Sequence, residues 1–230
     1  MSLASLSSAA LMAVAVLQSA APVRVLVVTG GHSYPTSFYT LFEQPGLTWD
    51  HAVSSEEAYR RDLRDRYDVL VLHDMPKTLG EDGQRHLRDF AESGKGVVVI
   101  HHAIVSYPDW DWYRDLIGAR YLEQPAGGLP ASTYRHDETM RITVARQHPV
   151  TAGLVDFTLR DETYKGMWLA PGNTVLLTTD NPTGDPPVAW VSTYDKSHVV
   201  TIQLGHGPES HHDASYRRLI LNAIRWSAAR

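Results

Sequence analysis

The sequence predicts an α/β fold with a doubly wound, mostly parallel sheet and helices on both faces. Continuous β-branched runs at 24–29, 68–72 and 96–100 have the composition of strands buried on both sides. Segments with helical periodicity separate these runs, as right-handed crossovers between parallel strands require. After residue 118 this alternation loosens into shorter strand-like runs.

Local signals define the individual elements in order along the chain. Helices are expected where a serine, threonine or aspartate cap precedes helical spacing, or where glycine follows it. The expected helices cover 36–44, 54–66, 78–93 and 110–117, and a last amphipathic helix begins after Asp213. The expected strands cover 24–29, 47–53, 68–72, 96–100, 140–145 and 175–179, with a late hairpin of 188–194 and 198–204.

One domain is expected over 22–230, because no linker, internal repeat or low-complexity tract interrupts the chain. Residues 1–21 differ, since they carry no charge, are rich in alanine and serine, and contain a short apolar stretch at 10–17. This stretch has the length of a signal-peptide core and is too short to span a bilayer. We therefore expect a leader or a disordered segment. A signal peptide would make the protein periplasmic or secreted, whereas an uncleaved leader would leave it cytoplasmic.

The composition excludes several classes of function. The formal net charge is −5 and no basic run is present, so nucleic acid and anionic membrane are not expected partners. The chain has no cysteine, which excludes disulfides, thiolate metal sites and a cysteine nucleophile. No nucleotide cofactor and no membrane span are predicted, and a homo-oligomer is compatible with the sequence.

Histidines stand at the ends of four predicted strands. The residues are His32, His73, the pair His101-His102, and His206. In open α/β sheets ligands bind in the crevice beyond the carboxyl ends of the strands, so these side chains are expected to line one pocket. Imidazole binds metals and titrates near neutral pH, which equips such a pocket for catalysis.

A set of short motifs runs in order through almost all of the chain after residue 21. The motifs are Val-Val-Thr-Gly-Gly-His at 27–32, Val-Ile-His-His-Ala at 99–103, Trp110 and Tyr113 before Gly118, His-Pro-Val-Thr-Ala-Gly-Leu at 148–154, Asp-Glu-Thr-Tyr at 161–164, Pro-Val-Ala-Trp-Val at 187–191, Gly205-His206, and Leu-Asn-Ala-Ile-Arg-Trp at 221–226. Together they resemble the ThuA-like (trehalose utilisation) family, which is related in fold to class I glutamine amidotransferases.

The resemblance implies a flavodoxin-like sheet in a single ThuA-like domain. It also implies that the amidotransferase nucleophile elbow, a cysteine on the tight turn after a central strand, is replaced here by His101-His102. Because the chain holds no cysteine, glutaminase chemistry is excluded. The substrate class implied by the resemblance is a disaccharide or a keto-sugar derived from one.

Catalytic roles are assigned to His101, His102, Glu162 and Asp74. Side chains alternate along a strand, so only one of His101 and His102 is expected to face the pocket, and His102 is favoured at the elbow-like position. Glu162, expected in a loop, is a candidate general base or metal ligand, and its alternative is a solvated acidic loop. Asp74 is expected to orient a histidine ring nitrogen, or else to cap a turn.

A metal site is predicted on His32, His102 and His206, with zinc as the expected divalent transition ion. Three protein ligands and one open position form the usual catalytic arrangement for zinc. His136 and His148 are expected to be structural, with His136 in an exposed connection. The pair His211-His212 is expected on a solvated rim, and its spacing from His206 also permits a shared metal.

Substrate contacts are assigned to four residues. Gly31 lets the backbone approach a ligand closely, and Trp110 and Tyr107 are candidate aromatic platforms for a sugar face. Tyr164 is a candidate hydrogen-bond partner for a sugar hydroxyl, a role that follows from its place in the family motif. The alternative for the aromatic residues is that they hold a loop against the core.

Two interpretations of function follow. The first is a carbohydrate-processing enzyme of hydrolase, lyase or isomerase type, acting on a small-molecule sugar through a histidine-rich pocket. In this pocket the histidines either bind a metal or act as acid and base alone. The second is a non-catalytic sugar-binding or sensing domain on an amidotransferase-like fold. The enzyme is preferred because several titratable side chains together are more typical of catalysis than of binding alone.

Overall fold

A nine-stranded mixed sheet runs through the computed structural model, which describes residues 21–229. The strand order is β2-β1-β3-β4-β11-β10-β9-β6-β7. The strands are β1 (Val23–Val28), β2 (Leu47–Ala52), β3 (Val69–Leu72), β4 (Gly96–Ile100), β6 (Thr133–Val144), β7 (Phe157–Lys165), β9 (Thr174–Thr179), β10 (Pro187–Val191) and β11 (Val199–Ile202). A separate small pair joins β5 (Ala119–Arg120) to β8 (Trp168–Leu169). The expected leader lies outside the described residues, except for Ala21.

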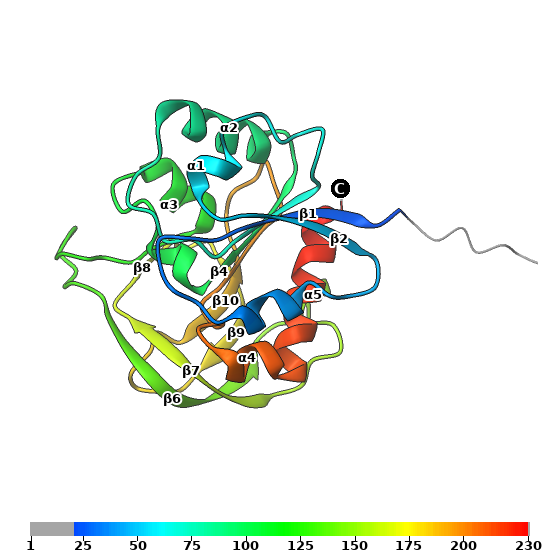
Figure 1. Ribbon diagram of the computed structural model, residues 1–230. Helices are drawn as coiled ribbons and strands as arrows, with labels where there is room; N and C mark the ends of the chain where they lie inside the picture. Colours follow the sequence, from blue (N-terminus) through cyan, green and yellow to red (C-terminus); the bar gives the residue numbers. More distant parts are fainter. Residues whose placement is uncertain (1–20, 230) are drawn as a thin grey trace, which may run out of the picture.

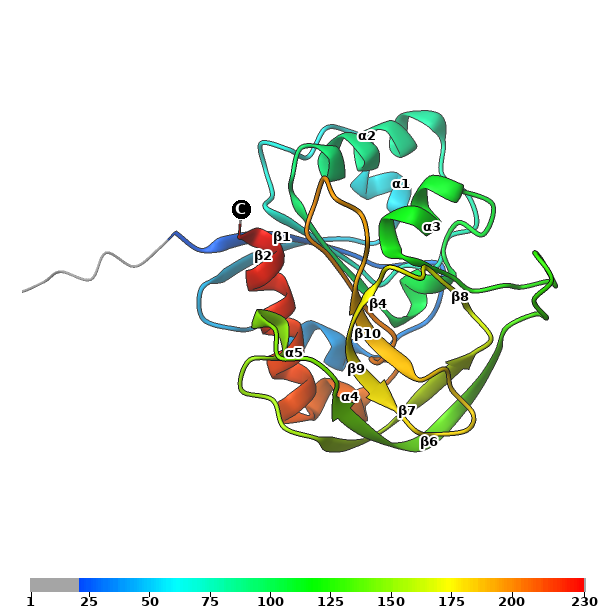
Figure 2. The ribbon, with the colours of Figure 1, turned by 180° about the vertical axis from the view of Figure 1, so that it is seen from behind.

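The sheet has a parallel part and an antiparallel part. Strands β2, β1, β3, β4 and β11 are parallel to their neighbours, in the order typical of flavodoxin-like folds. Strands β10, β9, β6 and β7 extend the sheet with antiparallel pairs. Figure 2 shows β6 and β7 at the end of the sheet far from β2. The predicted fold class and the late β10–β11 hairpin are confirmed.

Helices cover both faces of the sheet, as Figure 1 shows. One face carries α1 (Ser55–Ala58), α2 (Glu81–Glu92) and α3 (Asp111–Ile117), which pack on the apolar residues of β1, β3 and β4. The other face carries η1 (Thr36–Leu41), α4 (Pro208–His212) and α5 (Ala214–Ala228). The remaining short helices are η2 (His101–Val105) and η3 (Pro149–Thr151). The β-branched strands are thus buried on both sides, as their composition predicted.

Several expected boundaries are wrong, and each difference has a local cause. The helix expected to reach residue 66 is only one turn, because the Asp62 carboxylate accepts the Arg64 backbone N–H and so favours a turn over a helix. Thr78 caps no helix, since α2 begins after Gly80. The helix α4 was not predicted at all.

The antiparallel part differs most from the prediction. Strand β6 begins at Thr133, well before the expected strand at 140–145, and β7 contains the acidic segment that was expected to be a loop. Charged and polar residues fill the first half of β6, and the side chains there are mostly exposed. An exposed polar strand has no apolar alternation, so its sequence does not distinguish it from a loop.

No helix within residues 21–229 combines the length and the hydropathy that crossing a membrane requires.

Candidate active site

A pocket of about 230 Å³ opens where the carboxyl ends of the parallel strands meet β6 and β7. The residues that line it include His32, His102, His136, Glu162, Tyr164 and His206. They come from the loop after β1, from η2, from the loop after β11 and from the β6–β7 pair. The pocket therefore forms at the predicted edge of the sheet, with a contribution from the antiparallel part that was not predicted.

His102 lines this pocket, whereas His101 is fully buried beside it, so the expectation that one of the pair faces the pocket agrees with the structure, but not because side chains alternate along a strand. Strand β4 ends at Ile100, and the chain turns at once into η2. Because the strand does not continue, the alternation of side chains does not apply. The two ring centroids are 4.7 Å apart. His101 and not His102 stands at the sharp turn, with a φ of 44°, the left-handed backbone of a strained strand-to-helix elbow.

The tautomer of His101 is fixed by its partners. Nδ1 lies 2.6 Å from the carbonyl oxygen of Gln203, which can only accept, so Nδ1 carries the proton. Nε2 is 3.1 Å from the hydroxyl of Tyr164 and 3.1 Å from Nδ1 of His206. Burial holds the pKa of His101 well below its usual value, so the ring is neutral and Nε2 offers a lone pair.

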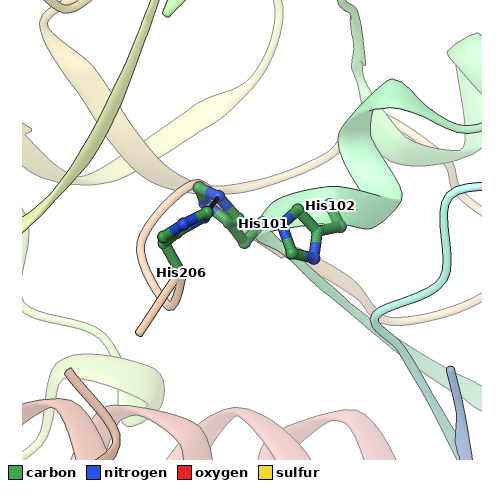
Figure 3. A group of neighbouring side chains, drawn as sticks. All are labelled: His101, His102 and His206. Atoms are coloured by element: carbon green, nitrogen blue, oxygen red, sulfur yellow. Dashed lines mark hydrogen bonds between the residues drawn. The ribbon is translucent and has the colours of Figure 1, made fainter. Parts of the chain in front are cut away.

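His102 lies beside His101, is 3% exposed, and has no hydrogen-bond partner on either ring nitrogen. Its ring centroid is 4.2 Å from that of His32, 4.7 Å from that of His73 and 5.4 Å from that of His206. Burial and the neighbouring His101 lower the pKa of His102. A buried imidazole without partners is costly, and a bound water, ion or ligand removes that cost. Figure 3 shows the rings of His101, His102 and His206 gathered in one place.

Glu162 is on β7 and buried, so the alternative of a solvated acidic loop is wrong. Its Oε2 lies 2.7 Å from Nδ1 of His136 and 3.0 Å from Nδ1 of His206, and Oε1 is 3.9 Å from Nε2 of His101. Burial and the Asp161 carboxylate raise the pKa of Glu162 to about 7. The carboxylate is thus within proton-transfer distance of two imidazoles at the pocket wall.

His136 was expected to be structural, but it is part of the pocket. It lies on β6 where the register with β7 shifts between Arg135 and Glu138. Asp137 there has a φ of 61°, in the left-handed region. Such bulges redirect side chains next to active sites, and here the His136 ring meets Glu162. Nothing in the polar sequence of this strand indicates a bulge, so sequence reasoning missed the residue.

Asp161 links the segments that carry the pocket residues through four hydrogen bonds to its carboxylate. Its Oδ2 accepts the Gly205 N–H at 2.6 Å and the Ser210 hydroxyl at 2.5 Å. Its Oδ1 accepts the His206 N–H at 3.0 Å and the Glu162 N–H at 2.8 Å. One buried carboxylate thereby fixes the loop that carries His206 against the strand that carries Glu162.

His211 was expected on a solvated rim, but it is fully buried. Its Nε2 donates to the carbonyl of Gly205 at 3.1 Å, so Nδ1 accepts from the hydroxyl of Ser37 at 2.9 Å. These hydrogen bonds connect the loop that carries His206 to the residue Ser37 of η1. His73 is buried as well, stacked on Phe38 with ring centroids 4.1 Å apart.

Five of the expected site residues do not line the pocket, namely His101, Asp74, Gly31, Tyr107 and Trp110. Asp74 accepts from the hydroxyl of Ser55 at 2.5 Å, while its neighbour His73 is paired with the carbonyl of Ile100 instead. Asp74 therefore does not orient a histidine. Gly31 has a φ of 76°, and a Cβ there would lie 2.6 Å from the backbone of Met75, so both the conformation and the space require glycine. Close packing of the chain on itself thus explains this glycine.

Tyr107 and Trp110 pack within the core below α3 instead of lining the pocket. Tyr107 is 3% exposed, and its ring meets those of Trp110 and Tyr113 edge-on. Trp110 packs against Trp112, with ring centroids 4.9 Å apart. The alternative interpretation, that these aromatic residues hold a loop on the core, agrees with the structure. Tyr164, in contrast, lies in the pocket wall beside His101.

Two overlapping sets of side chains have the spacing of a metal site among the residues that the structure describes. The first is His101, His102 and His206, and the second is His136, Glu162 and His206. In each set the donor atoms lie within 4.8 Å of one another. The expected set of His32, His102 and His206 is not among them. His32 lines the pocket, but its side chain is exposed and its Nδ1 donates to the carbonyl of Ser33 at 2.7 Å.

Solved structures with the same fold were found by comparison. A ThuA-like protein from Parabacteroides merdae ATCC 43184 is similar with a TM-score of 0.76 at 20% identity, over 90% of each chain. A ThuA-like protein from Bacteroides uniformis ATCC 8492 is similar with a TM-score of 0.69 at 21% identity, over 90% of this chain and 92% of that one. PurLQS from Thermotoga maritima gives a TM-score of 0.58 at 15% identity, over 90% of this chain and 99% of that one. The comparison with curated proteins gave no match.

The fold is that of glutamine amidotransferase-like domains, and the sequence contains no cysteine that could serve as a nucleophile. A family model described as ThuA, trehalose utilisation, matches residues 24–227. The chain therefore belongs to the ThuA family, and the description of that family points to a role in carbohydrate metabolism.

Proposed function

We propose that this protein is a carbohydrate-processing enzyme that moves a proton to or from a disaccharide or a keto-sugar in its histidine-rich pocket. The observation that carries the proposal is the place of Glu162, a buried carboxylate in the pocket wall within hydrogen-bond distance of both His136 and His206. The family description supports a sugar as the substrate. A divalent transition ion on the histidines is part of the proposal, and its ligands are argued below.

The residues suggest how the chemistry proceeds on a keto-sugar. The Glu162 carboxylate removes a proton from the carbon next to the carbonyl, and the electron pair of that C–H bond moves onto the carbonyl oxygen. His136 shares the carboxylate, with its Nδ1 2.7 Å from Oε2, so it relays the proton to another position of the substrate. Return of the proton to carbon completes an isomerisation. Expulsion of a neighbouring group from the same intermediate completes an elimination.

Exchange of hydrogen for deuterium on the substrate tests this proposal. Disaccharides and their keto forms are incubated with the protein in D₂O and followed by NMR, which detects deuterium entering the carbon next to the carbonyl. We expect Glu162→Gln to slow exchange by about 10²–10⁴-fold, the usual contribution of a general acid–base group. Glu123→Gln is the matched control, because Glu123 also lines the pocket but is exposed and paired with Lys77.

Two results would overturn the proposal. If sugars bind but neither exchange nor product appears in any metal condition, the protein is a sugar-binding or sensing domain, which the missing cysteine nucleophile also permits. If Glu162→Gln exchanges as fast as the wild type, the carboxylate is not the proton-transfer group.

A further inference from the structure

We propose that His101, His102 and His206 bind one divalent transition metal ion, with Zn²⁺ as the best fit, through three imidazole nitrogens that converge at the pocket. This inference deepens the proposed function and depends on it only for the use of the ion in catalysis. The predicted ligand His32 is replaced by His101, which stands at the left-handed turn after β4.

The spacing of the nitrogens suits a tetrahedral ion. Zinc–nitrogen bonds are about 2.0–2.1 Å, so two nitrogens on one tetrahedral ion lie ~3.3 Å apart. Nε2 of His101 and Nδ1 of His206 are 3.1 Å apart. A nitrogen of His102 lies within 4.8 Å of both, so a small rotation of this ring completes the set.

The groups around the histidines prepare them for a metal. A ligating histidine usually donates its second ring N–H to a carbonyl or carboxylate, which fixes the tautomer and the ring orientation. His101 does this through the carbonyl of Gln203, at 2.6 Å. The Asp161 carboxylate accepts the backbone N–H of His206 at 3.0 Å and so fixes the position of this residue.

His102 supplies an independent observation that points to a bound ligand. Its ring is buried, points into the cluster, and has no partner on Nδ1 or Nε2. Buried polar atoms in native proteins are almost always satisfied, and the neighbouring rings of His32, His73 and His101 offer no hydrogen bond to it. A metal ion at the centre of the cluster satisfies this ring.

The rival set of His136, Glu162 and His206 is less suited to hold the ion. His136 and Glu162 already satisfy each other at 2.7 Å, and the side chain of His136 is 54% exposed. Glu162 is next to the three histidines, with Oε2 3.0 Å from Nδ1 of His206. An ion held by these histidines would leave a coordination position for a water or a sugar oxygen, which it would polarise, with the carboxylate nearby.

Metal binding is measured without any sugar. The full chain is stripped with a chelator, titrated with Zn²⁺ or Co²⁺, and analysed for bound metal and for the visible absorption of tetrahedral Co²⁺. We expect one ion per chain. Loss of a second-layer partner alone weakens metal sites by about 10–100-fold, so His102→Gln and His206→Gln are expected to weaken binding at least ~100-fold.

His136→Gln and His212→Gln are the controls, since His136 belongs to the rival set and His212 is exposed on the same helix as His211. Both are expected to bind the ion like the wild type. No bound metal in the wild type overturns the proposal, and so does equal weakening by His136→Gln. If His102→Gln fails to fold, His206→Gln, which changes a half-buried side chain, and the Co²⁺ spectrum of the wild type still test the proposed site. Sugar turnover that persists in chelator overturns the use of the ion in catalysis, whereas the proposed proton transfer by Glu162 is then tested separately by Glu162→Gln.

Discussion

Asp74 is the buried acid whose environment has the clearest consequence outside the pocket. One of its oxygens accepts from the hydroxyl of Ser55, while Oδ1 has no partner. The hydroxyls of Tyr59 and Tyr107 are also buried without partners. Burial raises the pKa of Asp74 to about 6. Ionisation of this buried carboxyl therefore lowers the stability of the folded state at neutral pH.

That pKa predicts how stability depends on pH. The unfolded chain releases this proton near pH 3.9, whereas the folded chain keeps it until about pH 6. The folded state is thus favoured below both values and loses stability as pH rises through 6, by about 2–3 kcal/mol at pH 7. Asp74→Asn cannot ionise, and its amide oxygen still accepts from Ser55. We expect the stability of the variant relative to wild type to rise by about 2–3 kcal/mol from pH 4 to pH 7.5.

Urea unfolding at the two pH values measures this difference. Asp137→Asn removes the same charge from an exposed side chain and is expected to show no comparable change. A relative stability of Asp74→Asn that stays constant with pH would mean that the buried carboxyl has an ordinary pKa.

At the scale of elements, the loop between β11 and α4 determines where His206 lies. Gly205 has a φ of 120°, a conformation that side chains rarely adopt. A Cβ there would lie 2.1 Å from the hydroxyl of Tyr216 and 3.0 Å from Ile100. The hydroxyl cannot easily withdraw, because it donates to the carbonyl of Leu204 at 3.1 Å. Glycine is therefore required at the point where β11 ends.

We expect Gly205→Ala to destabilise the protein by about 2–4 kcal/mol, from backbone strain together with the steric clash. Thermal and urea unfolding measure the loss, and metal uptake reports whether His206 has moved. Gly127→Ala is the control, because a Cβ at Gly127 meets nothing within 4 Å although its φ is also positive. Equal effects of the two substitutions would show that strain alone, and not the contact with Tyr216, determines the requirement.

At the scale of the whole molecule, the parallel part of the sheet could be predicted and the antiparallel part could not. Strands such as β3 and β4 are buried on both faces, so their apolar runs are visible in the sequence. Strand β6 is mostly exposed over its first half, and its pairing with β7 depends on contacts between distant segments. This is why Glu162 was placed in a loop and His136 outside the site.

The pocket was predictable only as far as the parallel strands form it. The topology of parallel strands brings their carboxyl ends to one edge, so His101, His102 and His206 could be expected together. The choice between His101 and His102 could not be made, because it depends on where β4 stops, and boundaries depend on tertiary contacts. Gly31, Tyr107 and Trp110 were assigned to substrate from residue type and from their places after the strand ends, neither of which reveals burial.

The junction between the two parts of the sheet therefore depends on a small number of buried polar groups, and Asp161 is the main one. It accepts four donors, from Gly205, His206, Ser210 and Glu162. An asparagine has one acceptor oxygen and presents an N–H₂ group where the carboxylate presents its second oxygen. About two of the four donors are then left buried without a partner, at about 1–3 kcal/mol each. We expect Asp161→Asn to lower the free energy of unfolding by about 2–5 kcal/mol.

Urea unfolding gives the loss of stability, and amide hydrogen exchange tests its location. The amides of Gly205 and His206 are expected to exchange faster in Asp161→Asn, while those of β1 and β3 keep their protection relative to global unfolding. Asp156→Asn is the matched control, because its carboxylate also accepts a backbone N–H, from Val144 at 3.0 Å, but at the exposed end of the β6–β7 hairpin. That substitution is expected to cost less than about 1 kcal/mol. If the two variants lose stability equally, burial of the junction is not what makes Asp161 important.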